Sequence, residues 1–153
     1  MRISEIVSPE AVVSDLRAET KEGVLRELSE AIAAAMPSLS ADAVAAILSE
    51  RERLGSTGIG GGAAIPHGKA PGIDRMVAAF GRSRAGVPFQ SLDGKPAHLF
   101  FAIVAPEQSA GMHLKALARI SRLLKDDHFR RALLEAEDAD GLRRVFREHD
   151  DRG

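Results

Sequence analysis

The segment that most constrains this chain runs from Arg51 to Lys69 and reads RERLGSTGIGGGAAIPHGK. A charged stretch leads into a loop rich in glycine, and the segment continues to Pro66-His67-Gly68. Glycines allow backbone conformations and close approaches that other residues do not, and Pro66 fixes the backbone just before the histidine. Because ordering such a loop costs conformational entropy, packing alone is a poor reason for it. We interpret the segment as a site that presents the imidazole of His67.

Composition sets wider limits on the function. A length of 153 residues predicts one domain over 1–153 with a real core, and a formal net charge of -1 argues against a nucleic-acid partner and a polybasic membrane anchor. No apolar run is long enough to span a bilayer, and residues 1–13 do not read as a secretory signal, so we expect no direct membrane insertion. The absence of cysteine excludes thiol catalysis and is compatible with a reducing cytoplasm, where we expect the protein to act.

Hydrophobic periodicity predicts an α/β sandwich, in which helices flank a mixed β-sheet. Thr20 and Ser40 are predicted to cap two antiparallel helices, and an almost wholly apolar segment after residue 96 is typical of a central strand. The predicted helices are 21–36, 41–54, 112–125, 129–135 and 142–149. The predicted strands are 12–13, 76–83, 97–104 and a weaker one at 86–92, with a turn at Asp93-Gly94.

Two nucleotide-binding patterns fail in the glycine-rich loop. Counting back from Gly68-Lys69, the phosphate-cradling pattern needs a glycine at position 63, which is alanine, and a hydroxyl residue at position 70, which is also alanine. The looser dinucleotide pattern at residues 58–63 needs a helix to open at the loop, but Pro66 and Gly68 stand there. We therefore expect no nucleotide cofactor.

The alternative is that His67 is a nucleophile. Neutral imidazole is a good nucleophile near neutral pH, and phosphoryl transfer to it needs positioning and donors for the phosphoryl oxygens. Ser56 and Thr57 offer hydroxyls as donors. The successive amides of Gly58 and the following glycines can form a concave anion-binding site, and the guanidinium of Arg51 can donate two parallel charged hydrogen bonds.

Ser56 and Thr57 have an alternative role as braces of the loop. Arg51 has an alternative role as a solvated residue at the end of a helix, because residues 50–53 alternate in charge like an exposed face that includes Glu52. His149 also lies among charged residues, and we expect it to be solvated.

The same segment resembles the phosphorylation site of IIA proteins of the phosphoenolpyruvate-dependent phosphotransferase system, of the mannitol/fructose class. The match is greatest to the nitrogen-regulatory IIA proteins, in which an STGIG loop leads to an IPHG histidine. It extends over nearly the whole chain, from SPEAVV near the start to HLKALARIS and the last helices. The resemblance implies a bacterial protein with the mannitol-type IIA fold.

The resemblance also implies roles for single residues. His67 would be phosphorylated through Nε2 by an HPr-like carrier of the NPr type, with Arg51 and His113 assisting. Binding of the phosphoryl group by Ser56, Thr57 and Gly58 is predicted from their hydroxyls and amides and not from the resemblance. The protein would be a phosphoryl carrier with a phosphohistidine intermediate, without a cofactor and without its own small-molecule turnover. A metal site at His67 and His113 lacks a clear third ligand, so we expect no metal.

The sequence is compatible with three functions. In the first, the protein regulates target proteins according to its phosphorylation state, in a nitrogen-related pathway. In the second, it passes the phosphoryl group from His67 to a IIB domain during sugar uptake. In the third, it is a ligand- or metal-binding module in which His67 is never phosphorylated. The STGIG-type loop and the lack of a fused IIB region favour the first function.

Overall fold

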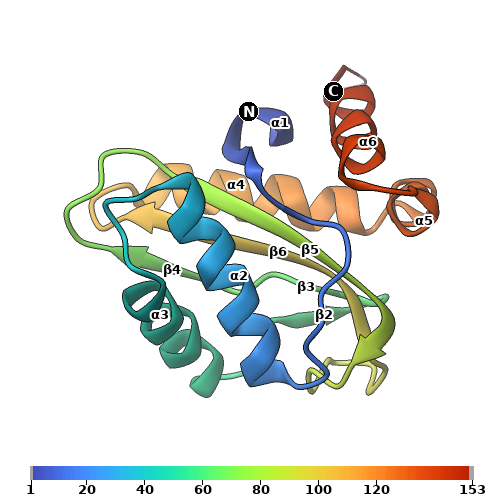
Figure 1. Ribbon diagram of the computed structural model, residues 1–153, viewed down its shortest axis with the longest axis horizontal. Coiled ribbons are helices and arrows are strands. Elements are labelled where there is room, and N and C mark those ends of the chain that lie inside the picture. Colours follow the sequence, from blue (N-terminus) through green and yellow to red (C-terminus); the bar gives the residue numbers. More distant parts are fainter. Residues whose placement is uncertain (1, 152–153) are drawn as a thin grey trace.

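The computed structural model describes residues 2–151, which form a mixed sheet covered by helices on both faces (Figure 1). The helices are α1 (Ile3–Ile6), α2 (Lys21–Ala35), α3 (Ala41–Arg53), α4 (Ala110–Leu124), α5 (Asp127–Glu135) and α6 (Ala139–Asp151). The strands are β1 (Val7–Val13), β2 (Gly58–Gly60), β3 (Ala63–Ala64), β4 (His67–Ala70), β5 (Val77–Val87) and β6 (Ala97–Pro106). Among the described residues, no helix is both long enough and apolar enough to cross a bilayer.

The sheet is built around β6. The strand order is β1-β5-β6-β3-β2, and β4 also pairs with β6. Strand β6 runs antiparallel to β5 and parallel to both β3 and β4, while β1 runs parallel to β5. The predicted mixed sheet flanked by helices is therefore confirmed.

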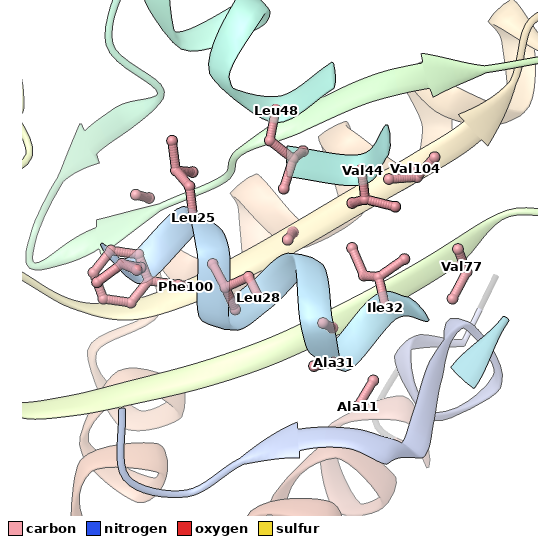
Figure 2. Close-up of a cluster of buried hydrophobic side chains, with 14 of the residues drawn as sticks. Ala11, Leu25, Leu28, Ala31, Ile32, Val44, Leu48, Val77, Phe100 and Val104 are labelled. Atoms are coloured by element: carbon pink, nitrogen blue, oxygen red, sulfur yellow. The ribbon is translucent and has the colours of Figure 1, made fainter. Parts of the chain in front are cut away.

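Alternating side chains of β5 and β6 supply two separate cores, one on each face of the sheet. Val77, Phe100 and Val104 pack against α2 and α3, with Leu28 of α2 in the centre (Figure 2). The opposite face packs against α1, α4, α5 and α6. Its core is formed chiefly by Ile3, Phe80, Phe101, Ile103, Ile120, Phe129, Leu133, Leu142 and Phe146. Both faces of β6 are buried, which explains why its sequence is almost continuously apolar.

Local sequence signals account for the ends of the helices. The hydroxyl of Thr20 accepts a hydrogen bond from the amide of Gly23, and that of Ser40 accepts one from Ala43, each at 3.1 Å. These are the contacts expected of N-cap residues, so both predicted caps are confirmed. Asp126 caps α5 in the same way, by accepting from the amide of His128 at 2.9 Å.

Several predicted elements need correction. The separate strand predicted at 86–92 is wrong, because 86–87 are the end of the long strand β5 and the chain leaves the sheet at Pro88, which has no amide donor. His149, predicted to be solvated, is buried against the ring of Phe129 at 4.8 Å between ring centroids. Helix α1 and the short strands β2 to β4 were not predicted, since a few residues carry too little periodicity.

Candidate functional site

His67 is the first residue of β4, at the edge of the sheet beside Ile103 of β6. Its neighbour Gly68 faces α3 so closely that an added Cβ would lie 2.3 Å from Cγ2 of Ile47. Glycine is therefore required at this contact with α3. Because successive side chains of a strand point to opposite faces, His67 points away from α3 and toward α4.

A hydrogen bond fixes the protonation of the His67 ring. Its Nδ1 lies 2.7 Å from the carbonyl oxygen of Ile65. A carbonyl can only accept, so Nδ1 carries the ring proton and Nε2 presents its lone pair. Nε2 has no hydrogen-bond partner within residues 2–151, and it is not enclosed by the protein. The half-buried ring thus offers a nitrogen whose lone pair has no hydrogen-bond partner.

His113 lies in the first turn of α4 and faces His67. The two rings meet edge to face, with centroids 5.4 Å apart and planes at 84°. Only 6% of His113 is exposed, and within the described part of the chain its Nε2 is buried without a hydrogen-bond partner. The hydroxyl of Ser109, before α4, donates to Pro106 and does not cap the helix. The first-turn amides of α4, which favour an anion, are therefore left without a side-chain cap beside His113.

The electrostatics keep both imidazoles neutral. Burial lowers the pKa of His67, and Arg51 lowers it further, against opposing effects of the Ile65 carbonyl and Glu52. Burial also lowers the pKa of His113, with smaller contributions from His67 and Lys69. A neutral ring at physiological pH is the state that can act as a nucleophile.

These lowered pKa values make stability depend on pH. Between the lowered values and the ordinary histidine pKa of about 6.5, the unfolded chain binds more protons than the folded one, so stability rises with pH through that window and is lost as the pH falls. We expect urea unfolding to show a lower free energy of unfolding at about pH 5 than at about pH 7.5. In the double variant His67→Gln/His113→Gln the slope should flatten. An unchanged slope would contradict this assignment.

Arg51 lies in the last turn of α3, the helix that packs against β4. Its Nη1 donates to the carbonyl of Gly55 at 2.9 Å, which holds the guanidinium against the start of the glycine-rich loop. Beside it a hollow of about 590 Å³ opens between α3 and β4. The hollow is lined by Ala46, Ile47, Glu50, Arg51, Leu54, Gly68 and Lys69.

The polar atoms of Ser56, Thr57 and Gly58 are engaged inside the protein. Ser56 donates to the carbonyl of Phe89 and accepts from the amide of Gly58. Both the amide and the hydroxyl of Thr57 donate to the carboxylate of Glu52. These bonds give the three residues the bracing role that was the alternative for Ser56 and Thr57, and their binding of a phosphoryl group stays a prediction.

Sequence reasoning missed Glu52. The alternation Glu50-Arg51-Glu52-Arg53 is typical of a solvated face, but Glu52 is buried while its neighbours Glu50 and Arg53 form an exposed ion pair. Nothing in the local sequence distinguishes the two glutamates. The signal lies in the contacts of Glu52 with Lys21, which is distant in the chain, and with Thr57 of the following loop, and only the fold brings these groups together.

Residues 2–151 contain no cluster of three or more histidine, aspartate or glutamate side chains arranged to hold a metal ion. The pair of His67 and His113 therefore has no third acidic or imidazole ligand within reach in the described structure. The arrangement suits a nucleophilic imidazole with a cation and free helix amides nearby.

Comparison with known proteins identifies the family. Residues 5–149 match the model for the phosphoenolpyruvate-dependent sugar phosphotransferase system, EIIA 2, and the chain belongs to this family. The nitrogen regulatory protein of Bradyrhizobium diazoefficiens is 41% identical over 146 residues, which is 95% of each chain. The fructose-specific EIIABC component of Bacillus subtilis is 39% identical over 150 residues, 98% of this chain but 24% of that protein. The crystal structure of the nitrogen regulatory protein IIA-Ntr from Neisseria meningitidis is 34% identical, with a TM-score of 0.88, covering 94% of this chain and 98% of that one.

Proposed function

We propose that the protein is a regulatory phosphocarrier of the nitrogen-related phosphotransferase system. In this proposal Nε2 of His67 accepts a phosphoryl group from an HPr-like carrier of the NPr type, in the cytoplasm. The observation that carries the proposal is the hydrogen bond between Nδ1 of His67 and the carbonyl of Ile65, which leaves Nε2 unpaired and nucleophilic.

The transfer balances without any further reactant. The lone pair of His67 Nε2 attacks phosphorus as the bond between phosphorus and the donor's histidine nitrogen breaks, and Nδ1 keeps its proton. In this proposal Arg51, the imidazole of His113 and the first amides of α4 stabilise charge on the transferred oxygens. The contact between the two imidazole rings and the effect of Arg51 on the pKa of His67 support these roles. The polar groups of Ser56, Thr57 and Gly58 are already engaged inside the protein, so in this proposal these three residues brace the loop around the transferred group.

The shape of the surface supports a protein as the donor. The hollow beside Arg51 is open and partly apolar, and Leu54 on its rim is 79% exposed. Met112, next to His113, is also exposed. Large exposed apolar side chains around a charged centre are typical of a surface that docks another protein.

A regulatory output is supported by the relatives from Bradyrhizobium and Neisseria, both called nitrogen regulatory proteins, which align along almost the full length of this chain. Phosphorylation adds about two negative charges to one point of the surface. Such a change can favour one set of target proteins and block another, so His67 would act as the switch.

The second candidate is a sugar-transport IIA component that passes the phosphoryl group on to a IIB domain. The similarity to the fructose-specific component of Bacillus favours it, because an identity of 39% is close to the 41% of the regulatory relative. Both candidates use the same chemistry at His67. They differ only in the protein that receives the signal or the phosphoryl group.

The test is an intact-mass measurement after incubation with phosphoenolpyruvate, the upstream enzyme and the HPr-like carrier. We expect an acid-labile gain of one phosphate. Adding a purified fructose-type IIB domain then separates the candidates, since a transport component loses its phosphate to IIB and a regulator retains it. No gain of mass with active carriers would refute both candidates and leave a binding module in their place.

A further inference from the structure

The buried carboxylate of Glu52 occupies a position that two general rules disfavour. Its side chain is only 4% exposed, and burial of a charge is costly unless the charge is paired. It is also the penultimate residue of α3, at the helix end where the macrodipole disfavours a negative charge. Residues that break local rules in a folded protein often serve a functional site.

Three contacts compensate for this burial. Oε1 of Glu52 accepts from Nζ of Lys21 at 2.8 Å and from the amide of Thr57 at 3.0 Å, and Oε2 accepts from the hydroxyl of Thr57 at 2.6 Å. Lys21 is the first residue of α2, so its cation also lies at the unfavourable end of a helix. The pair thus ties the end of α3 to the start of α2 and to the loop before β2.

A path of hydrogen bonds continues from Glu52 to the reactive ring. Thr57, held at both its amide and its hydroxyl, accepts the amide of Ile65 on its own carbonyl at 3.0 Å. The carbonyl of Ile65 is the group that binds Nδ1 of His67 at 2.7 Å. Each step fixes the backbone that supports the next one. Glu52 therefore has a continuous structural connection to the orientation and tautomer of the imidazole.

We propose that Glu52 is the positioning residue of the phosphoryl-transfer site, holding Thr57 and Ile65 so that His67 keeps its Nδ1 proton and presents Nε2. This inference rests on the proposed function. The carboxylate does not touch the reacting atoms and acts through the two backbone segments.

The charge of Glu52 has a second effect on the same ring. The charged and titratable groups that act on His67 are Arg51 and Glu52 from α3 and His113 from α4, and Lys69 of β4 acts on His113. Among them Glu52 alone is an anion. It opposes Arg51, and it stabilises the positive charge that develops on the imidazole as the nitrogen–phosphorus bond forms.

The first test is the variant Glu52→Gln, which keeps the size of the side chain and removes its charge. We expect single-turnover phosphoryl uptake at saturating carrier to slow by about tenfold or more, a loss of the size found when a residue that orients a metal-binding histidine is removed. We also expect the His67 ring protons to titrate at a lower pH by NMR. Glu30→Gln is the matched control, because it removes the same charge from an exposed pair with Arg26 and should change neither quantity.

If Glu52→Gln does not fold, a pair of variants at Thr57 tests the positioning role instead. Thr57→Val removes the hydroxyl and keeps the branched shape, while Thr57→Ser keeps the hydroxyl. We expect Thr57→Val to slow uptake several-fold and Thr57→Ser to restore it. Equal rates in wild type, Thr57→Val and Thr57→Ser would overturn the proposal, as would an unchanged rate and titration in a folded Glu52→Gln.

The titration separates this proposal from the function on which it rests. If the wild type takes up no phosphate, the proposed function fails, and the NMR titration of His67 in Glu52→Gln still measures the link between the two residues. If the wild type is phosphorylated, and Glu52→Gln matches it in both the rate of phosphoryl uptake and the His67 titration, the positioning role of Glu52 fails while the proposed function stands.

Discussion

We expect His67→Gln to abolish phosphoryl uptake completely. The glutamine amide can still donate a hydrogen bond toward the carbonyl of Ile65, so the edge of the sheet keeps its contacts, but an amide nitrogen has no available lone pair for attack on phosphorus. The measurement is the intact mass after incubation with phosphoenolpyruvate, the upstream enzyme and the carrier. The acid-labile gain of one phosphate seen in wild type should be absent at all times of incubation.

His98→Gln is the matched control for this variant. His98 is also half-buried, lies in β6, and places its Nδ1 2.9 Å from a backbone carbonyl, that of Ser83. It lacks the partner histidine and the neighbouring arginine that surround His67. His98→Gln should therefore be phosphorylated as fast as wild type. Acid-labile phosphate on His67→Gln, or its loss in His98→Gln, would show that the acceptor has been assigned to the wrong histidine.

His113→Gln should fall between these two variants. If His113 stabilises the transferred oxygens and is not the acceptor, phosphate still appears, but more slowly, by about 100-fold as for the loss of one oxyanion donor. A complete loss would instead make His113 an obligatory intermediate, which the buried position of its Nε2 argues against.

Much of this fold follows from local sequence signals. Helices α2 and α3 have apolar residues at helical spacing and hydroxyl caps at Thr20 and Ser40, and both formed close to their predicted limits. Strand β6 is long and apolar enough to be recognised alone. The strands β2 to β4 are different, because they are short and exist only through pairing with one another and with the far part of the chain. Their formation depends on contacts that no local pattern encodes.

The residues of the site likewise fall into those that the local sequence identifies and those that depend on distant contacts. His67 stands out because proline and glycines surround it, whereas His113 became a candidate only through the family resemblance. The pairing of the two rings depends on α4 crossing the sheet beside β4. Glu52 and His149 were both predicted to be solvated because charged residues flank them in the sequence. Each is buried by partners that are distant in the chain, Lys21 for Glu52 and Phe129 for His149.

The largest effect on stability is expected from Phe101→Ala. Phe101 is fully buried in the middle of β6, and its ring meets that of Phe80 at 4.9 Å and that of Phe146 at 5.8 Å between centroids. Truncation removes the shared contact of β5, β6 and α6 and leaves a cavity that the sheet cannot close. We expect a loss of about 3–5 kcal/mol in the free energy of unfolding, measured by urea denaturation.

Leu92→Ala provides the control for this loss. Leu92 is 90% exposed in the loop between β5 and β6, so its truncation should change the free energy of unfolding by less than about 0.5 kcal/mol. A loss below about 1 kcal/mol for Phe101→Ala would contradict the packing of α6 on this face of the sheet, because a site that collapses so readily cannot be a filled core.

At urea concentrations where Phe101→Ala is still folded, it should accept phosphate at His67, since Phe101 lies in the core and His67 lies in the edge strand β4. Stability and phosphoryl uptake are thus expected to separate in this variant.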